Sequence, residues 1–237
     1  MAYAGLGLMR QVIGRLILLP VLLAGSVSIL LADTHTWCGG AGPNWFDPAN
    51  WDAGLPATGD NVIIGPNGTN PTLTNSTPYL ATITVSNKTM TLANWTTTIR
   101  ASNVIIRSGG ILTLPSAFTT NQMSNRVWIV CTNLTINNGG QIDADYKGYY
   151  PWYGPGCPGS GGAYYWPGAS HGGRGGEGAS GNAWGKDPCG SASAPVWPGS
   201  GGGSYSDSGR QAAAGRGGGA VRIQASSTVT IDGTISA

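Results

Sequence analysis

The sequence predicts an all-β protein, a right-handed parallel β-helix (solenoid) that carries a glycine- and aromatic-rich insertion. Two observations support this prediction. A pattern of strand-forming residues that begins at Thr97 returns at Val127 without a gap, and a shorter copy starts at Val221. Within each copy, apolar and polar residues alternate, and polar or glycine pairs interrupt the alternation. Because such a unit cannot bury its apolar face alone, we expect successive copies to stack.

Each copy contains two predicted corners. Ile99 and Ala101 are two positions apart and share one face of a strand. After Ser102-Asn103 the apolar parity changes, and Val104 and Ile106 become the inward pair. We interpret the polar pair as a corner, because Asn tolerates left-handed backbone angles. A glycine pair supplies the second corner, so each coil should contain three short strands.

The predicted coil is about 19 residues long once insertions are removed. Corner pairs recur at 60–61, 86–87, 102–103, 132–133 and 226–227. Removing the loops 115–125 and 145–219 makes the later intervals equal. Both loops leave from equivalent positions, so we expect them on one edge of the stack, one coil apart. Gly233 stands alone where earlier copies have two glycines, so the last turn should be two residues tighter.

Residues 1–32 have the features of an export signal. Arg10 and Arg15 precede an almost unbroken apolar run that ends at Ala32. Cleavage is expected after Ala32 or after Ser26. The alternative is an uncleaved membrane anchor, since about 20 apolar residues can span a bilayer. Elsewhere the sequence has no membrane segment.

Without the two arginines of this segment, 10 basic residues balance 10 acidic ones. Only 9% of the residues are charged, against about 25% in typical globular proteins. This composition offers no electrostatic basis for binding nucleic acid.

Residues 33–60 form a predicted tryptophan-rich N-terminal cap before the coils at 61–144. They contain Thr36-Trp37-Cys38-Gly39-Gly40, Asn44-Trp45, Asn50-Trp51, Gly54-Leu55-Pro56 and Gly59-Asp60, and Asn61-Val62-Ile63-Ile64 follows. This order resembles the N-terminal motif of many bacterial secreted and autotransporter-like β-helix proteins. The resemblance implies that Trp37, Trp45 and Trp51 cover the first coil and that Asp60 stands at its first corner. Carbohydrate binding by these tryptophans is the alternative; we favour capping, because a solenoid end must be covered.

The insertion at 145–219 contains 24 glycines, seven tyrosines and four tryptophans. Its aromatic content argues against disorder. Two blocks of the insertion and the segment at its end resemble large glycine-rich secreted proteins of bacteria and plants, which implies a fold and a location but no activity. They are Gly168-Ala169-Ser170-His171-Gly172-Gly173-Arg174-Gly175-Gly176, Pro198-Gly199-Ser200-Gly201-Gly202-Gly203 and Gly217-Gly218-Gly219-Ala220-Val221-Arg222-Ile223. The segment 220–237 then resumes the coils. We expect this chain to be a fragment of a longer solenoid.

Aromatic side chains of the insertion are the candidate binding residues. Few aliphatic residues surround them, so some must pack on glycine backbone while others stay accessible. Flat rings with few charges suit neutral sugar rings or another protein's apolar surface. That all of them pack inside is the alternative. The candidates are Tyr149, Tyr150, Trp152, Tyr153, Tyr164, Tyr165 and Trp166.

Other candidate chemistry is sparse, and no cofactor is expected. Asp143 and Asp145 are weak candidates for binding calcium or for cleaving glycans, although turn capping is the favoured interpretation. His171 is interpreted as a hydrogen-bonding residue between glycine segments. The sequence contains no nucleophile motif, phosphate-binding loop or metal-ligand spacing.

The four cysteines have different predicted roles. Cys157 and Cys189 lie in the insertion and should form a disulfide worth about 3–4 kcal/mol. Cys131 should point inward as a small buried residue. Cys38 is left free, or pairs outside this chain.

These features predict a non-enzymatic secreted or cell-surface protein with a structural or adhesive role. The solenoid would be a spacer that presents the insertion to neutral glycans or to other surface proteins. A polysaccharide-active enzyme on the same scaffold, such as a pectate-lyase-like lyase or a glycosidase, is the alternative. An acidic cluster with Arg or Lys on a coil face would favour the enzyme, and the sequence offers only the aspartate pair at 143 and 145.

Overall fold

The computed structural model describes residues 32–119, 123–156, 168–170, 175–176, 187–191, 196–203, 205–207, 210–212 and 215–237. Several predictions fall outside these ranges: residues 1–31 of the export signal predicted at 1–32, and the residues Cys157, Tyr164, Tyr165, Trp166 and His171. Within the described ranges the chain is β-structure with loops, and the helical part is a single 3-10 turn, η1 (Pro48–Asn50). No helix among these residues is long and apolar enough to cross a membrane. The all-β prediction is confirmed.

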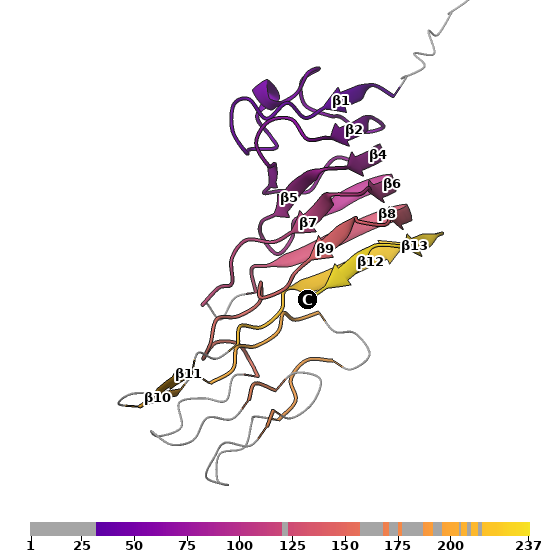
Figure 1. The fold of residues 1–237 in the computed structure, drawn as a ribbon. Coiled ribbons are helices and arrows are strands. Elements are labelled where there is room, and N and C mark those ends of the chain that lie inside the picture. The colour runs from indigo at the N-terminus through magenta and orange to yellow at the C-terminus, as the bar shows by residue number, and fades with distance from the viewer. Residues whose placement is uncertain are drawn as a thin grey trace, which may run out of the picture. The chain divides into compact units, whose positions relative to one another are not determined.

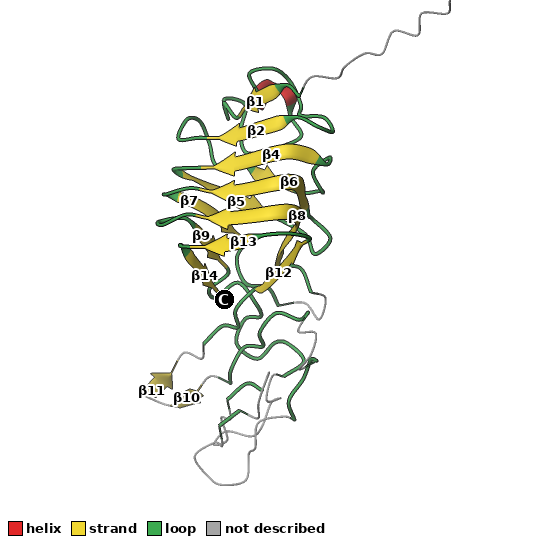
Figure 2. Ribbon diagram, turned by 90° about the vertical axis from the view of Figure 1, so that its right-hand side faces the viewer, coloured by secondary structure: helices red, strands yellow, loops and turns green. Residues whose placement is uncertain are grey.

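Two parallel sheets form the body of residues 32–237 (Figures 1 and 2). The first contains, in spatial order, β1 (Thr34–Thr36), β2 (Asn61–Ile64), β4 (Leu80–Val85), β6 (Ile99–Ile106), β8 (Arg126–Ile136) and β12 (Ala220–Ala225), and β13 (Val229–Ile231) also pairs with β8. The second contains β3 (Thr72–Leu73), β5 (Lys88–Leu92), β7 (Gly110–Thr113), β9 (Gln141–Asp143) and β14 (Thr234–Ser236). From β2 to β9 the chain alternates strictly between the sheets, and we call one such passage a repeat. A separate antiparallel pair joins β10 (Tyr205–Asp207) and β11 (Arg210–Ala212).

The register of the strands confirms the repeat that the sequence predicts. Ile99 pairs with Ile129 and Ala101 with Cys131, so neighbouring strands are aligned at the offset of the two sequence copies. The last turn is also as predicted. Ile231 pairs with Ile136 and Thr234 with Gln141, so the step from 231 to 234 replaces the longer step from 136 to 141 in the preceding repeat.

The predicted coil length is too short. Asn61 pairs with Thr82, and Thr82 pairs with Asn103, so a repeat without an insertion runs from 61 to 81 and the next from 82 to 102. The error comes from removing all 11 residues of 115–125 from the interval of 30 between Asn103 and Asn133, where a repeat of 21 leaves an excess of only 9. The equivalence predicted between Ser86-Asn87 and Ser102-Asn103 is also wrong. Instead, Asn87 precedes β5 at the level of Gly109, and its amide donates to the Ser108 carbonyl oxygen at 3.2 Å. Its φ of 49° shows that this is the left-handed turn position.

The predicted corner at Ser102-Asn103 is not a break in the strand. β6 runs through it, and the corresponding pair at 132–133 lies inside β8. Neither asparagine has a positive φ. The parity change is nevertheless real, because Ala101 and Val104 are both buried. The amide of Asn133 donates to Oδ1 of Asn103 at 3.0 Å, so the polar pairs stack from one repeat to the next.

The core consists of the inward side chains of the two sheets. Ile99, Ile106, Ile129 and Leu134 are fully buried. Cys131 is 3% exposed and belongs to the same cluster, which confirms its predicted inward position. Aliphatic side chains at matching positions in successive repeats therefore make one continuous apolar column.

The three predicted cap tryptophans lie together at the β1 end of this core. Trp37, Trp45 and Trp51 are at most 5% exposed. The Trp45 and Trp51 ring centroids are 4.6 Å apart at 76°, an edge-to-face contact. The indole N–H of Trp51 donates to the Trp45 carbonyl oxygen at 2.8 Å, and that of Trp37 to the Thr69 carbonyl oxygen at 2.7 Å. Buried rings with satisfied N–H groups are packing residues and expose no sugar-binding face.

Candidate binding surface

Both insertions leave from the same edge of the sheets, as the sequence predicts. Thr113 at the end of β7 pairs with Asp143 at the end of β9, so the following loops start one repeat apart. The side-chain amide of Asn125, at the end of the first loop, donates to the Lys147 carbonyl oxygen at 2.9 Å. Phe118 and Tyr149 form a parallel bridge between the two loops. The first loop therefore supports the base of the second.

The base of the large insertion is built by glycine backbones in direct contact. The Gly148 N–H donates to the Gly217 carbonyl oxygen at 2.7 Å, and the Gly199 N–H donates to that of Gly218 at 2.8 Å. A Cβ on Gly217 would stand 1.7 Å from the Gly199 carbonyl oxygen, and one on Gly148 would stand 2.2 Å from that of Gly218. Only glycine allows these segments to approach so closely. This explains why glycine occupies positions 148, 199 and 217.

The structure divides the candidate aromatic residues into buried and accessible ones. Tyr149 is 2% exposed, and its ring centroid lies 4.4 Å from that of Phe118. Burial raises the pKa of its hydroxyl. Tyr149 therefore belongs to the interior of the insertion. Tyr153 is 41% exposed, and Tyr150 and Trp152 are half-buried.

A strained turn adjoins these residues. The Asp143 carboxylate accepts a hydrogen bond from the Asp145 N–H at 3.0 Å, which confirms the turn-capping interpretation of this pair. The next residue, Tyr146, has a φ of 57°, and its side chain is 67% exposed. Trp152 also has a positive φ, at 71°. Bulky residues rarely occupy this region, and such strain is concentrated at functional sites.

A small cavity opens beside the turn. It has a volume of about 240 Å³ and is lined by Asp145, Tyr146, Arg216, Gly218 and Ala237. The Arg216 guanidinium carbon lies 4.4 Å from the centroid of the Tyr150 ring, a cation–π contact that holds the side chain. Among the described residues, no salt bridge involves Asp145 or Arg216. Both residues are exposed, so their acceptor and donor groups are accessible to a ligand.

We define the aromatic surface as Tyr146, Tyr150, Trp152, Tyr153 and Arg216, together with Asp145. Tyr146, Asp145 and Arg216 were not among the sequence candidates for this surface. A turn-forming tyrosine that is strained and exposed has no sequence signal, and Arg216 lies at the far end of the insertion from Tyr150, whose ring it contacts. The cavity itself is lined by the ring of Tyr146, one carboxylate and one guanidinium, and it is smaller than a drug-sized pocket. Tyr150 adjoins it through its contact with Arg216.

The remaining sequence candidates are placed as follows. Cys38 is exposed and Cys131 is buried, and neither forms a disulfide. The Cys189 thiol lies 3.3 Å from the Ser170 carbonyl oxygen, while its predicted partner Cys157 lies outside the described residues. In the described part of the chain, no three His, Cys, Asp or Glu side chains are grouped as a metal site would require.

His35 is a residue whose role the sequence did not reveal. It is 5% exposed, and Nε2 lies 3.0 Å from Oδ2 of Asp60 while Nδ1 lies 2.8 Å from the Gly54 carbonyl oxygen. This pair links β1 to the residue that precedes β2.

A protein-family search, a search of curated proteins and a search of solved structures each found no match to this chain.

Proposed function

We propose that the two sheets are faces of a right-handed parallel β-helix. The alternation of the chain between two parallel sheets, with register kept from repeat to repeat, supports this architecture. Right-handed crossovers account for about 98% of parallel β-strand connections, which supports the handedness. The buried tryptophans would then close the first coil.

We further propose that the chain is a secreted or cell-surface protein with a non-enzymatic, adhesive role. The observation that carries this proposal is the aromatic surface beside a strained turn, held on a rigid sheet edge by two mutually bonded loops. Tyrosine faces stack on the apolar faces of neutral sugar rings, while a carboxylate and a guanidinium can bond to sugar hydroxyl groups. A cavity of about 240 Å³ limits the buried part of the ligand to a small unit such as one sugar ring.

Removal of the insertion tests the proposal. We expect this removal to leave the two sheets intact, because the ends of the insertion lie side by side. The Gly219 N–H donates to the Ala144 carbonyl oxygen at 2.7 Å, so the two ends of the insertion are already adjacent. A chain in which a short Gly-Ser turn replaces residues 146–218 should retain its β-sheet circular dichroism and its thermal transition. It should also lose retention on insoluble neutral glycans. Undiminished retention by the folded deletion variant would contradict the proposal.

A further inference from the structure

Asp60, the residue directly before β2, is a buried carboxylate with three polar neighbours. Its residue exposure is 7%. Oδ2 accepts from the Ala57 N–H at 2.7 Å and contacts Nε2 of His35 at 3.0 Å. Oδ1 accepts from the Asp33 backbone nitrogen at 3.2 Å. A carboxylate removed from water requires strong partners, because a buried charge without compensation is costly.

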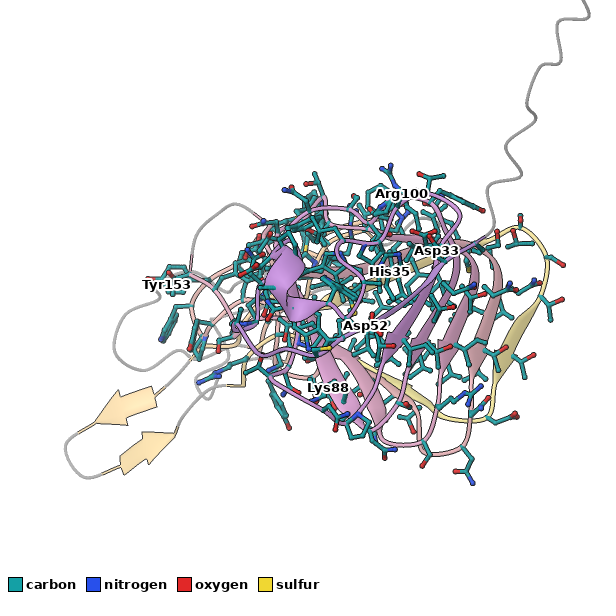
Figure 3. The ribbon with its side chains drawn as sticks, turned by 90° about the horizontal axis from the view of Figure 1, so that it is seen from above. Asp33, His35, Asp52, Lys88, Arg100 and Tyr153 are labelled. Atoms are coloured by element: carbon teal, nitrogen blue, oxygen red, sulfur yellow. The ribbon has the colours of Figure 1, made fainter. Side chains whose placement is uncertain are left out.

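The third polar neighbour stands at a special place in the chain. Asp33 directly follows the apolar segment that the sequence predicts to be an export signal. Ala32, Asp33 and Thr34 are exposed, whereas His35 is buried. Both Asp33 and His35, labelled in Figure 3, contact the carboxylate of Asp60. The Ala32–Asp33 bond is therefore accessible to a protease, and the nitrogen it would release already faces a carboxylate.

We propose that the chain is cleaved between Ala32 and Asp33, and that the new α-ammonium group of Asp33 forms an ion pair with Asp60. This proposal rests on the proposed export. A signal peptidase would hydrolyse the Ala32–Asp33 amide: water adds, Ala32 leaves with a carboxylate and Asp33 keeps the nitrogen as an ammonium group. Cleavage then changes a neutral amide donor at 3.2 Å into a charged one without movement of the chain.

The contacts of Asp33 disfavour cleavage at any bond after Asp33. The Asp33 carbonyl oxygen accepts from the Asn61 N–H at 2.7 Å, and Thr34 pairs with Asn61 in the first parallel ladder. Removal of Asp33 would break the first of these contacts and the bond to Asp60. Ala32 supplies the small residue directly before the cut, while Leu30 occupies the other small position of an A-x-A-like site. Cleavage after Ser26 would instead leave Asp33 as an uncharged amide donor.

The first test is the mass of the exported protein. The full chain is produced in a bacterial host with an intact export pathway, and the intact mass and N-terminal sequence of the extracytoplasmic fraction are measured. The expected chain begins at Asp33. An exported chain that begins at Val27 or at any other residue overturns the cleavage site but not the export. A full-length chain confined to the cytoplasm contradicts the proposed export and this inference together.

The second test addresses the ion pair itself. Mature protein that begins at Asp33 is compared with protein that carries two extra residues, Gly-Ser, before Asp33, each with and without Asp60→Asn. In the native background the extension should lower the Tm by about 2–4 °C, and in Asp60→Asn it should have no effect. Asp232→Asn, at an exposed aspartate, is the charge-matched control and should keep the full extension effect. An extension effect equal in the native and Asp60→Asn backgrounds would overturn the ion pair, whatever the cost of Asp60→Asn alone.

Discussion

The guanidinium carbon of Arg126 lies 4.2 Å from the centroid of the Trp128 ring. On another side it lies 4.3 Å from the Trp95 ring, and its Nη2 donates to the Trp95 carbonyl oxygen at 2.8 Å. Arg222 lies 4.8 Å from the same Trp128 ring. Arg126 is 5% exposed, and no described carboxylate forms a salt bridge with it. The guanidinium charge is thus stabilised by cation–π contacts with two indole rings instead of by a carboxylate.

Arg126→Lys should destabilise the protein by about 1–2 kcal/mol, because an ammonium group cannot stack on two rings and reach the Trp95 carbonyl in one pose. Desolvation, followed by the charge of Arg222, lowers the pKa of Arg126, so the site already disfavours the charge and depends on the rings. Urea unfolding measures the loss. Arg100→Lys, at an exposed position of β6, should change the free energy of unfolding by less than about 0.5 kcal/mol. Equal losses from both variants would contradict this role.

Trp45→Ala should cost about 3–5 kcal/mol, the range for a large buried aromatic side chain. Its ring is 1% exposed and contacts both other cap tryptophans. Trp197 is 38% exposed, so Trp197→Ala is a matched tryptophan control with little expected change in Tm. If Trp45→Ala preserved the Tm but reduced binding to glycans, the cap tryptophans would be a ligand site instead.

The buried Cys131 thiol should be inert in the native state, whereas Cys38 should react with iodoacetamide. Burial raises the pKa of Cys131, which disfavours the reactive thiolate. Above a pH of about 8.5, the ordinary pKa of a cysteine, the thiol loses its proton in the unfolded chain but keeps it in the folded one. The free energy of unfolding that the protonated Cys131 contributes is therefore fully present below this pH and is lost as the pH rises above it. Mass spectrometry of labelled native protein checks the difference, and fast native labelling of Cys131 would refute its burial.

Gly217→Ala should disorder the base of the insertion, because the added methyl group would overlap the Gly199 carbonyl. The two-sheet body should stay folded, since these glycines lie outside its strands. Limited proteolysis should cut the insertion faster in this variant. Gly215→Ala is the control, because a Cβ there meets nothing within 4 Å. If both variants were cut at the native rate, close glycine packing would not be what orders the base.

The repeat was readable from the sequence where two copies keep the same residue pattern over their whole length. The ungapped copies at 97–114 and 127–144 fixed the register of β6 against β8. In the earlier repeats the corner positions were wrongly assigned, because Ser86-Asn87 and Ser102-Asn103 have the same composition but occupy different positions in the repeat. One forms a left-handed turn before β5, and the other lies inside an unbroken strand that carries a side-chain ladder.

The candidate site was only partly predictable, because its members meet through the packing of the insertion. Local composition identified the aromatic cluster but could not distinguish Tyr149, which Phe118 covers, from Tyr153, which stays exposed. Arg216 and the strained Tyr146 join the surface through contacts distant in sequence and through a φ angle. The buried pair of His35 and Asp60 was missed for the same reason, since only the β1–β2 pairing brings them together.

The most direct test of the proposed function is the affinity of the Tyr146→Ala/Tyr153→Ala double variant for insoluble neutral glycans, with cellulose and chitin as the probes. Both rings are exposed, so the variant should keep its native Tm. Tyr79→Ala, at a tyrosine 44% exposed in the loop before β4, is the control. The account predicts that the native chain and Tyr79→Ala bind at least one glycan equally, and that the double variant binds it at least about tenfold more weakly, a loss of about 1.4 kcal/mol. Equal binding by the folded double variant, or no binding by the native chain, would contradict it.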